Sequence, residues 1–216
     1  MALIHQATLR PTKLELLATW LPGRAWYTGP AGEVLRVGTF RFDDPAGEVG
    51  IETLLVRVGD GPVHQVPLTY RDAPLADDDD YLLGTTEHSV LGKRWIYDGT
   101  GDPVYAAALA GAILGNTGQA EEFTQVDGRL ERREPSMSIA SSATGGAEVP
   151  AVGAVQRVAE GDPTLIVTDT VELSVIRRLE AGTALAGTVL TGAWPGQATP
   201  MPLASATLRN SAESPS

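Results

Sequence analysis

The sequence has 216 residues, no cysteine, and 16 basic against 27 acidic side chains, which gives a formal net charge of −11 at pH 7. This charge disfavours nucleic acids and anionic membranes as partners, because such contacts depend on neutralising phosphates. The lack of cysteine excludes disulfides, thiolate nucleophiles and zinc–thiolate sites, and no apolar run approaches the roughly 20 residues that span a bilayer. Since the N-terminus also lacks a charged stretch followed by a cleavable apolar core, we expect a cytoplasmic protein.

The first predicted elements are a helix and an antiparallel meander. The helix covers residues 12–21, with Thr12 as its cap and Pro22-Gly23 as its end. Three strands follow, over residues 33–43, 49–58 and 63–70. The first of these strands alternates only in part, so we expect a twisted strand with both faces partly covered. The pattern predicts one helix that lies on a curved antiparallel sheet.

A second helix is the clearest element of the chain and is predicted over residues 103–114. Asp102 is a good cap, Pro103 suits the first helical position, and Gly115-Asn116 supplies a left-handed stop. No charged residue occurs between Asp102 and Glu121, so we predict a buried helix. Residues 87–97 are predicted to form a hairpin that turns at Leu91-Gly92, and we expect the helix to pack on it.

The remaining elements are mostly predicted strands. They cover residues 125–138, 139–158, 164–169 and 170–179, followed by a weak helix over 183–194, an edge strand over 201–208 and a flexible tail over 210–216. The sequence therefore predicts an α+β fold, with antiparallel sheets and few packed helices. We expect two closely packed subdomains, residues 1–98 and 99–209.

Three stretches resemble catalytic or binding motifs without matching one. The four consecutive acids from Asp77 to Asp80 lack the alternation of a calcium loop, so a solvated loop is expected and no metal site. Glu87 and His88 stand beside Ser89, but the strand pattern and the lack of a nucleophile elbow favour a structural histidine. The Gly-rich loop over 141–147 matches neither dinucleotide-binding nor P-loop patterns. No catalytic residue and no cofactor are predicted.

Two longer stretches carry a resemblance to a known family. Residues 20–29, WLPGRAWYTG, are similar to the W-L-P-x-x-R-W-[FY]-x-G opening of the cap subdomain of actinobacterial maltokinases, with the arginine shifted to Arg24. Residues 161–182, GDPTLIVTDTVELSVIRRLEAG, align without gaps to a family segment that ends in R-R-L-E-x-G. Asp102-Pro103 heads a helix that also follows the cap sheet in those kinases. The resemblance implies the family's N-terminal lobe, made of a cap and an intermediate subdomain.

The departures from the family pattern fall on its nucleotide site. In this register the lysine that holds the nucleotide phosphates is replaced by Ser174, and a hydroxyl cannot supply that charge. The phosphate loop is replaced by residues 159–164, in which Glu160 and Asp162 repel phosphate and Pro163 lacks an N–H. The resemblance therefore marks four positions of a degenerate nucleotide site: Gly161, Asp162, Thr164 and Ser174.

The family's catalytic residues also have no counterpart in this sequence. Those kinases carry a His-Gly-Asp base and a magnesium-binding Asp-Phe-Glu in a C-terminal lobe, which we expect this chain to lack. None of the three histidines is followed by Asp at the second position. Without a base or metal ligand, phosphoryl transfer has neither a positioned nucleophile nor a charge clamp.

These observations leave three interpretations open. The leading one is a non-catalytic, free-standing relative of the maltokinase N-terminal region that binds or regulates an unidentified protein, in the context of glycogen or trehalose and maltose metabolism. The second is a binder of a small molecule such as a sugar, or an enzyme of unrelated chemistry. Its cleft would lie between the subdomains, with Trp26, Tyr27, Glu87 and His88 as lining residues. The third is one half of a split kinase.

Overall fold

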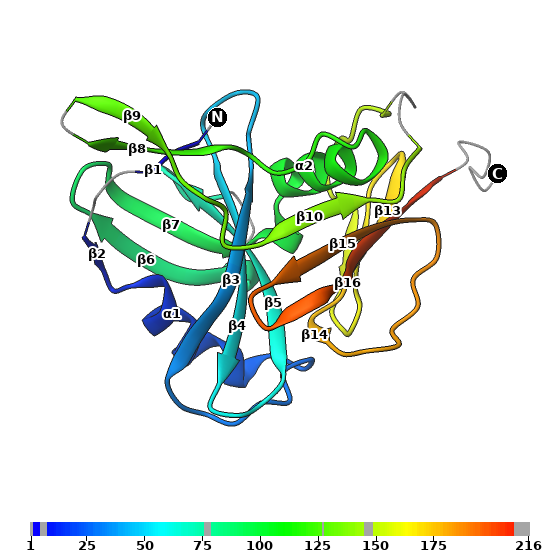
Figure 1. Ribbon diagram of the computed structural model, residues 1–216, viewed down its shortest axis with the longest axis horizontal. Coiled ribbons are helices and arrows are strands. Elements are labelled where there is room, and N and C mark those ends of the chain that lie inside the picture. Colours follow the sequence, from blue (N-terminus) through cyan, green and yellow to red (C-terminus); the bar gives the residue numbers. More distant parts are fainter. Residues whose placement is uncertain (1, 5–7, 76–78, 127, 145–148, 210–216) are drawn as a thin grey trace.

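The computed structural model describes residues 2–4, 8–75, 79–126, 128–144 and 149–209 (Figure 1). In the described chain, three β-sheets are combined with two α-helices, and every strand pair except β1–β8 is antiparallel. The predicted α+β class with antiparallel sheets and few helices is therefore confirmed. Among the described helices, none has the length and apolar character needed to cross a membrane.

The largest sheet is built from the first half of the chain. Its strands, in spatial order, are β2 (Leu9–Arg10), β6 (Leu82–His88), β7 (Gly92–Asp98), β5 (Val63–Arg71), β4 (Gly50–Val58) and β3 (Val34–Phe42). A short strand from much later in the chain, β14 (Arg178–Leu179), also pairs with β5. Three 3₁₀ turns accompany this region, η1 (Leu21–Gly23), η2 (Asp79–Tyr81) and η3 (Gly99–Gly101).

The second half of the chain forms a six-stranded sheet. Its spatial order is β10 (Ser138–Ser141), β15 (Thr188–Trp194), β16 (Gln197–Leu208), β13 (Val171–Val175), β12 (Thr164–Val167) and β11 (Arg157–Ala159). A small third sheet, β1 (Ala2–Ile4), β8 (Glu122–Val126) and β9 (Arg129–Arg132), forms an arm at the upper left of Figure 1.

Two strands of the second sheet, β15 and β16, differ from the sequence prediction. Residues 188–194 form a strand and not part of a weak helix, because β15 pairs along its length with β10 and β16. Leu190, Gly192 and Trp194 of this strand are buried, while Thr191 and Ala193 between them are more exposed. The expected edge strand, β16, lies in the middle of the sheet between β15 and β13. Both errors concern pairings between distant segments, which local patterns do not report.

The first helix, α1 (Lys13–Trp20), begins and ends where the sequence predicts. Thr12 Oγ1 accepts a hydrogen bond from the Glu15 amide at 3.2 Å, and the Glu15 carboxylate accepts one from the Thr12 amide at 2.7 Å. This reciprocal capping box satisfies two amides that the helix leaves unpaired. The helix lies against β3 and β6 and buries Leu17 and Trp20.

The capping box gives a first prediction. Thr12→Ala should lower the free energy of unfolding by about 1 kcal/mol, because the Glu15 amide loses its acceptor. Thr19→Ala, an exposed threonine on the same helix, should leave the stability unchanged or slightly higher, since alanine favours the helix. Urea unfolding followed by circular dichroism measures both variants. Equal losses in the two would show that the cap does not contribute.

The second helix, α2 (Pro103–Leu114), also has the predicted bounds. Asp102 caps it by accepting a hydrogen bond from the Val104 amide at 2.9 Å. Just beyond its C-terminal end, Asn116 has a positive φ of 52°, the left-handed conformation that was expected to end the helix. The expected packing on the hairpin before it is wrong, because its main strand contacts are with β3, β10, β13, β15 and β16. The later strands supply the apolar side chains that the helix needs, whereas the hairpin of β6 and β7 extends away from α2, toward the left of the view (Figure 1).

Two hydrophobic cores lie on the two faces of the large sheet. Leu54, Val56 and Val58 of β4 face α1, while Ile51 and Leu55 face α2 and the six-stranded sheet. The second core therefore joins the two halves of the chain. The division into subdomains 1–98 and 99–209 stays a prediction.

A bulge in β3 explains why this strand contributes to both cores. The register between β3 and β4 shifts between Arg36 and Gly38. As a result, Val34 packs in the α1 core and Phe40 in the α2 core, although the two residues have the same parity. Strict alternation therefore holds only in part, and both faces of the strand are partly covered, as expected.

Candidate functional site

The residues of the expected nucleotide site serve the structure of the chain. Both carboxylate oxygens of Asp162 accept backbone amides, from Arg177 at 2.8 Å and from Arg178 at 3.2 Å. The Thr164 hydroxyl donates to the Gly161 carbonyl at 3.0 Å and accepts from the Arg177 guanidinium. Ser174 lies in β13, opposite Leu165 of β12 and Ser205 of β16. These groups fix a turn and the strands that flank it.

A fully buried arginine next to this turn joins the two halves of the chain. The guanidinium of Arg177, which is 1% exposed, donates to the Asp98 carboxylate at 2.7 Å, the Thr100 hydroxyl at 3.0 Å and Thr164 Oγ1 at 2.7 Å. It also lies 4.6 Å from the ring centroid of Trp26. A buried ion pair with additional hydrogen bonds is costly to break, because removal of one partner leaves a buried charge.

Trp26 and Tyr27, two of the proposed cleft residues, belong to an aromatic cluster. Trp26 is 4% exposed and packs beside Trp20, with 5.9 Å between the ring centroids. Tyr27 lies 4.7 Å from the His64 ring, and its hydroxyl donates to the Pro30 carbonyl at 2.6 Å. Burial lowers the pKa of His64 and raises the pKa of Tyr27. The Trp26 ring is thus a buried core residue.

Glu87 and His88, the other two proposed cleft residues, lie at a different place in the fold. They end β6, where they pair with Lys93 and Gly92 of β7. Nδ1 of His88 accepts the amides of Val90 and Leu91 at 3.2 and 3.0 Å, so the imidazole closes the hairpin turn.

The strand pairing in the large sheet shows that Glu87 and His88 lie far from Trp26 and Tyr27. His64 stands near the start of β5, and Arg71 at its end pairs with Trp95 of β7. The pairing of Glu87 with Lys93 lies beyond Trp95, farther along the same direction. The structure therefore places Trp26 and Tyr27 at one end of the sheet and Glu87 and His88 at the other, and does not bring the four residues together.

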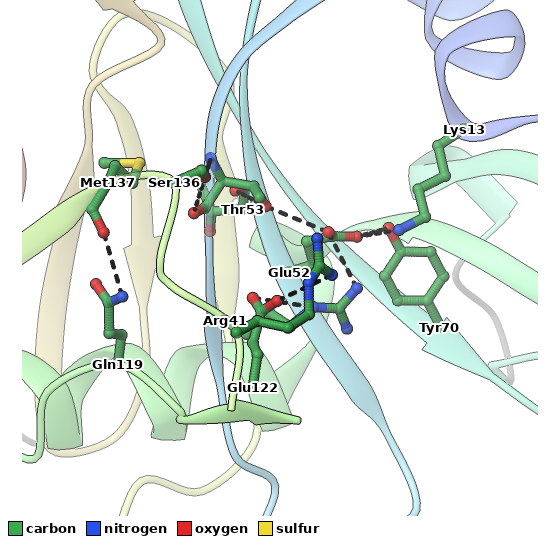
Figure 2. A network of polar contacts seen from close by, with 11 residues as sticks. Lys13, Arg41, Glu52, Thr53, Tyr70, Gln119, Glu122, Ser136 and Met137 are labelled. Atoms are coloured by element: carbon green, nitrogen blue, oxygen red, sulfur yellow. Dashed lines mark hydrogen bonds and ion pairs between the residues drawn. The ribbon is translucent and has the colours of Figure 1, made fainter. Parts of the chain in front are cut away.

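A buried carboxylate that the sequence interpretation missed lies at the centre of a second polar network (Figure 2). Glu52, 3% exposed, forms ion pairs with Lys13 of α1 and with Arg41 of β3, the latter at 3.0 Å. It also accepts hydrogen bonds from the Tyr70 hydroxyl at 2.7 Å and from Thr39 Oγ1 at 3.2 Å. The sequence signal for this network was a glutamate inside the mostly apolar strand segment IETLLV.

The network shifts the protonation equilibria of its members. Burial alone would raise the pKa of Glu52, but the charges of Lys13 and Arg41 and the hydrogen bonds of Lys13 and Tyr70 outweigh it and hold that pKa well below its usual range. Burial lowers the pKa of Lys13, and Glu52 offsets part of this effect. Burial and the nearby Glu52 charge raise the pKa of Tyr70 well above its usual value. Because all the oxygens of Glu52 are engaged, the network holds α1 on the sheet and leaves no free base.

A third feature is a cavity of about 760 Å³ beside α2, which we call the α2 groove. Four segments line it: residues 42–45 after β3, the α2 positions 103, 104, 107, 108 and 111, residues 117–120, and residues 152–154. Ala107 is exposed here, and Val104, Ala108 and Gly111 are half-buried. The expectation of a buried helix is therefore wrong along this face, which is open although it carries no charged residue.

The α2 groove is mostly apolar and acidic at one end. Among its described lining residues, none is Lys, Arg or His, and Asp43 and Asp44 are the charged ones. Asp44 accepts the amides of Ala46, Glu48 and Val49 and so also shapes the turn. Across the described residues, no group of three or more His, Cys, Asp or Glu side chains is arranged to hold a metal ion; residues 77 and 78 of the acidic run lie outside the described part.

The comparison with known families identifies the region that contains the large sheet. Residues 20–102 match the family model of the maltokinase N-terminal cap domain. The match extends from the end of α1 through β7 to Asp102, the cap of α2. It confirms the resemblance seen in residues 20–29, while residues 161–182 lie outside it. No curated protein matches the sequence.

Proposed function

We propose that this protein, whose residues 20–102 match the maltokinase N-terminal cap domain, is a non-catalytic binding module and does not use a nucleotide. The observation that carries this proposal is the bonding of Asp162. Its two carboxylate oxygens hold the amides of Arg177 and Arg178, so a negative charge stands where the family resemblance would place phosphates. A phosphate site needs N–H donors that point outward and a neighbouring cation.

Two further observations support the same conclusion. The position of the phosphate-binding lysine is taken by Ser174, inside a sheet whose neighbouring strands flank it on both sides. The α2 groove lies elsewhere and has an acidic end that disfavours a nucleotide. The cap-domain match suggests a partner in maltose and glycogen metabolism.

Addition of ATP gives the test of this proposal. Millimolar ATP with magnesium should leave the melting temperature unchanged in the natural protein, and no maltose should be phosphorylated. A ligand at 100 times its dissociation constant would stabilise the fold by about 2.7 kcal/mol, which a thermal-shift assay detects.

The matched variant is Ser174→Lys, which restores one charge but not the donors of the loop. It should also fail to respond to ATP. A dose-dependent rise in melting temperature with the natural protein, reproduced by calorimetry, would overturn the proposal. The alternative of a split kinase half requires the same nucleotide site and would then be revived.

A further inference from the structure

The small three-stranded arm has an outer strand, β9 (Arg129–Arg132), whose far edge is not paired with any described strand. β8 lies between β9 and β1, and Figure 1 shows β9 along the outer margin of the arm. All four residues of β9 are exposed, and the apolar side chain of Leu130 is 54% exposed. An exposed strand edge can bind a further strand through its main chain.

The hydrogen bonds inside the arm determine which main-chain groups of β9 point outward. The Arg133 amide, directly after β9, donates to the Glu122 carbonyl of β8 at 2.8 Å. Hydrogen-bonded and non-hydrogen-bonded pairs alternate along an antiparallel ladder. The odd-numbered residues of β9 therefore bond to β8, while the amide and carbonyl groups of Leu130 and Arg132 point away from it.

The charges of β9 select one register for pairing with a second copy of the same strand. An antiparallel pair that is centred on one residue places this residue opposite its own copy. Centres at Arg129, Glu131 or Arg132 would therefore oppose like charges, which destabilises a sheet. A centre at Leu130 opposes two leucines, which exchange two main-chain hydrogen bonds. It also places Arg129 of each copy opposite Glu131 of the other.

The side chains that this register brings together are available. In the described part of the chain, neither Arg129 nor Glu131 forms an ion pair, whereas Arg132 already pairs with Glu121 at 3.0 Å. Short strands and charged side chains also serve to keep sheet edges unpaired. A pattern with that purpose opposes like charges, but the register centred on Leu130 opposes unlike charges at both flanking positions.

The net charge of the whole chain, −11, acts against the association of two copies. β9 has two arginines and one glutamate, 2 − 1 = +1, so the contact itself is not acidic. At physiological salt, exposed charges that are farther apart than about 8 Å are largely screened from one another. Because the paired strands are short, the interface belongs to the small and weak class, and association depends strongly on protein concentration.

We propose that β9 pairs with β9 of a second copy of the chain, antiparallel and centred on Leu130, so that the two arms form one continuous sheet. The two leucines lie side by side on one face of this sheet, and the two pairs of Arg129 with Glu131 lie on the other face. The inference goes beyond the proposed function and does not depend on the state of the nucleotide site.

Charge reversal in the full chain tests the register. Arg129→Glu leaves two acidic positions beside Leu130, and Glu131→Arg leaves two basic ones. Each variant alone opposes like charges and should associate about tenfold or more weakly than the natural protein. An equimolar mixture of the two variants should recover association, because every arginine then faces a glutamate. The double variant Arg129→Glu with Glu131→Arg should also associate as the natural protein does.

Sedimentation velocity, over a concentration series that reaches the millimolar range, gives the dissociation constants. Hydrogen exchange at the Leu130 amide should slow as the concentration of the natural protein rises. Leu130→Pro removes this outward amide and should abolish association, while the fold tolerates a proline whose missing N–H faces solvent on an edge strand. Leu130→Ser should weaken association, whereas Leu208→Ser, at a leucine that is 62% exposed on another sheet, should leave it unchanged. Circular dichroism verifies that each variant is folded.

Several results would overturn the inference. These are a natural protein that stays monomeric at millimolar concentration, association that both single charge variants retain, and a mixture of these variants that does not recover it. Exchange at Leu130 that is independent of concentration would place any association on another surface. Protection of this amide by an added extended peptide, without self-association, would assign the edge to a different partner. A response to ATP would contradict the proposed function alone.

Discussion

Arg177→Met is expected to lower the free energy of unfolding by about 3 to 5 kcal/mol, the range for removing one partner of a buried ion pair. The Asp98 carboxylate, 3% exposed, would lose its charged partner, and the Thr100 and Thr164 hydroxyls would each lose a hydrogen bond. The methionine side chain is shorter and loses the guanidinium contact with the Trp26 ring, but it keeps the apolar stem of the arginine. The loss measures the charge and its hydrogen bonds more than the packing.

The next residue provides the control for this change. Arg178 pairs with Glu180 at 3.0 Å, but their side chains are 35% and 53% exposed. Arg178→Met should therefore cost less than about 1 kcal/mol. The double variant Arg177→Met with Asp98→Asn should recover part of the loss, because the buried charge is then gone. Urea unfolding monitored by tryptophan fluorescence gives these values, and equal losses for Arg177 and Arg178 would show that the buried pair is not a main support of the fold.

Glu52→Gln should destabilise the protein by about 3 kcal/mol, because Lys13 and Arg41 would then face each other in a mostly buried space without a compensating carboxylate. The amide keeps the shape of the side chain and can still accept from Tyr70. Glu87→Gln, at an exposed position at the end of β6, serves as the control and should have little effect.

The same variant should change how stability depends on pH. The folded-state pKa of Glu52 lies below its unfolded value of about 4.3. Its contribution to stability is therefore present above about pH 4.3 and is lost as the pH falls below that value. The natural protein should lose more stability than Glu52→Gln between pH 5 and pH 2.5, measured by urea unfolding at each pH. Parallel curves would mean that the network does not hold the carboxylate ionised.

Local signals in the sequence predicted the elements whose ends are set by cap residues or by turn residues. The caps Thr12 and Asp102 fixed the starts of α1 and α2 within one residue, because the cap side chains bind amides of the same helix. The strands β4 and β5 were also predicted, since their apolar runs are bounded by Gly and Pro turns. These predictions need no knowledge of distant residues.

The rest of the fold depends on contacts between distant parts of the chain. The central position of β16 follows from its pairing with β13 and β15, and the bulge in β3 changes the face of Phe40 after the first residues of the strand. Arg177 was part of a recognised Arg-Arg pair, but its partner Asp98 is 79 residues away. The α2 groove was not predicted because a helix without charge usually indicates burial, and the open side depends on loops that have no local signal.

One short strand has a consequence for how the chain is made. β14 completes the edge of β5 at Val63 and His64, and the Gln65 amide bonds to the Arg177 carbonyl at 2.7 Å. The cap-domain match ends at residue 102, whereas β14 ends at residue 179. A growing chain therefore leaves this edge of β5 unpaired until residue 179 has been added. At about 5 to 20 residues per second, that interval lasts about 4 to 15 seconds. During synthesis, the strand edge at Val63 and His64 can therefore pair only after β14 has been made.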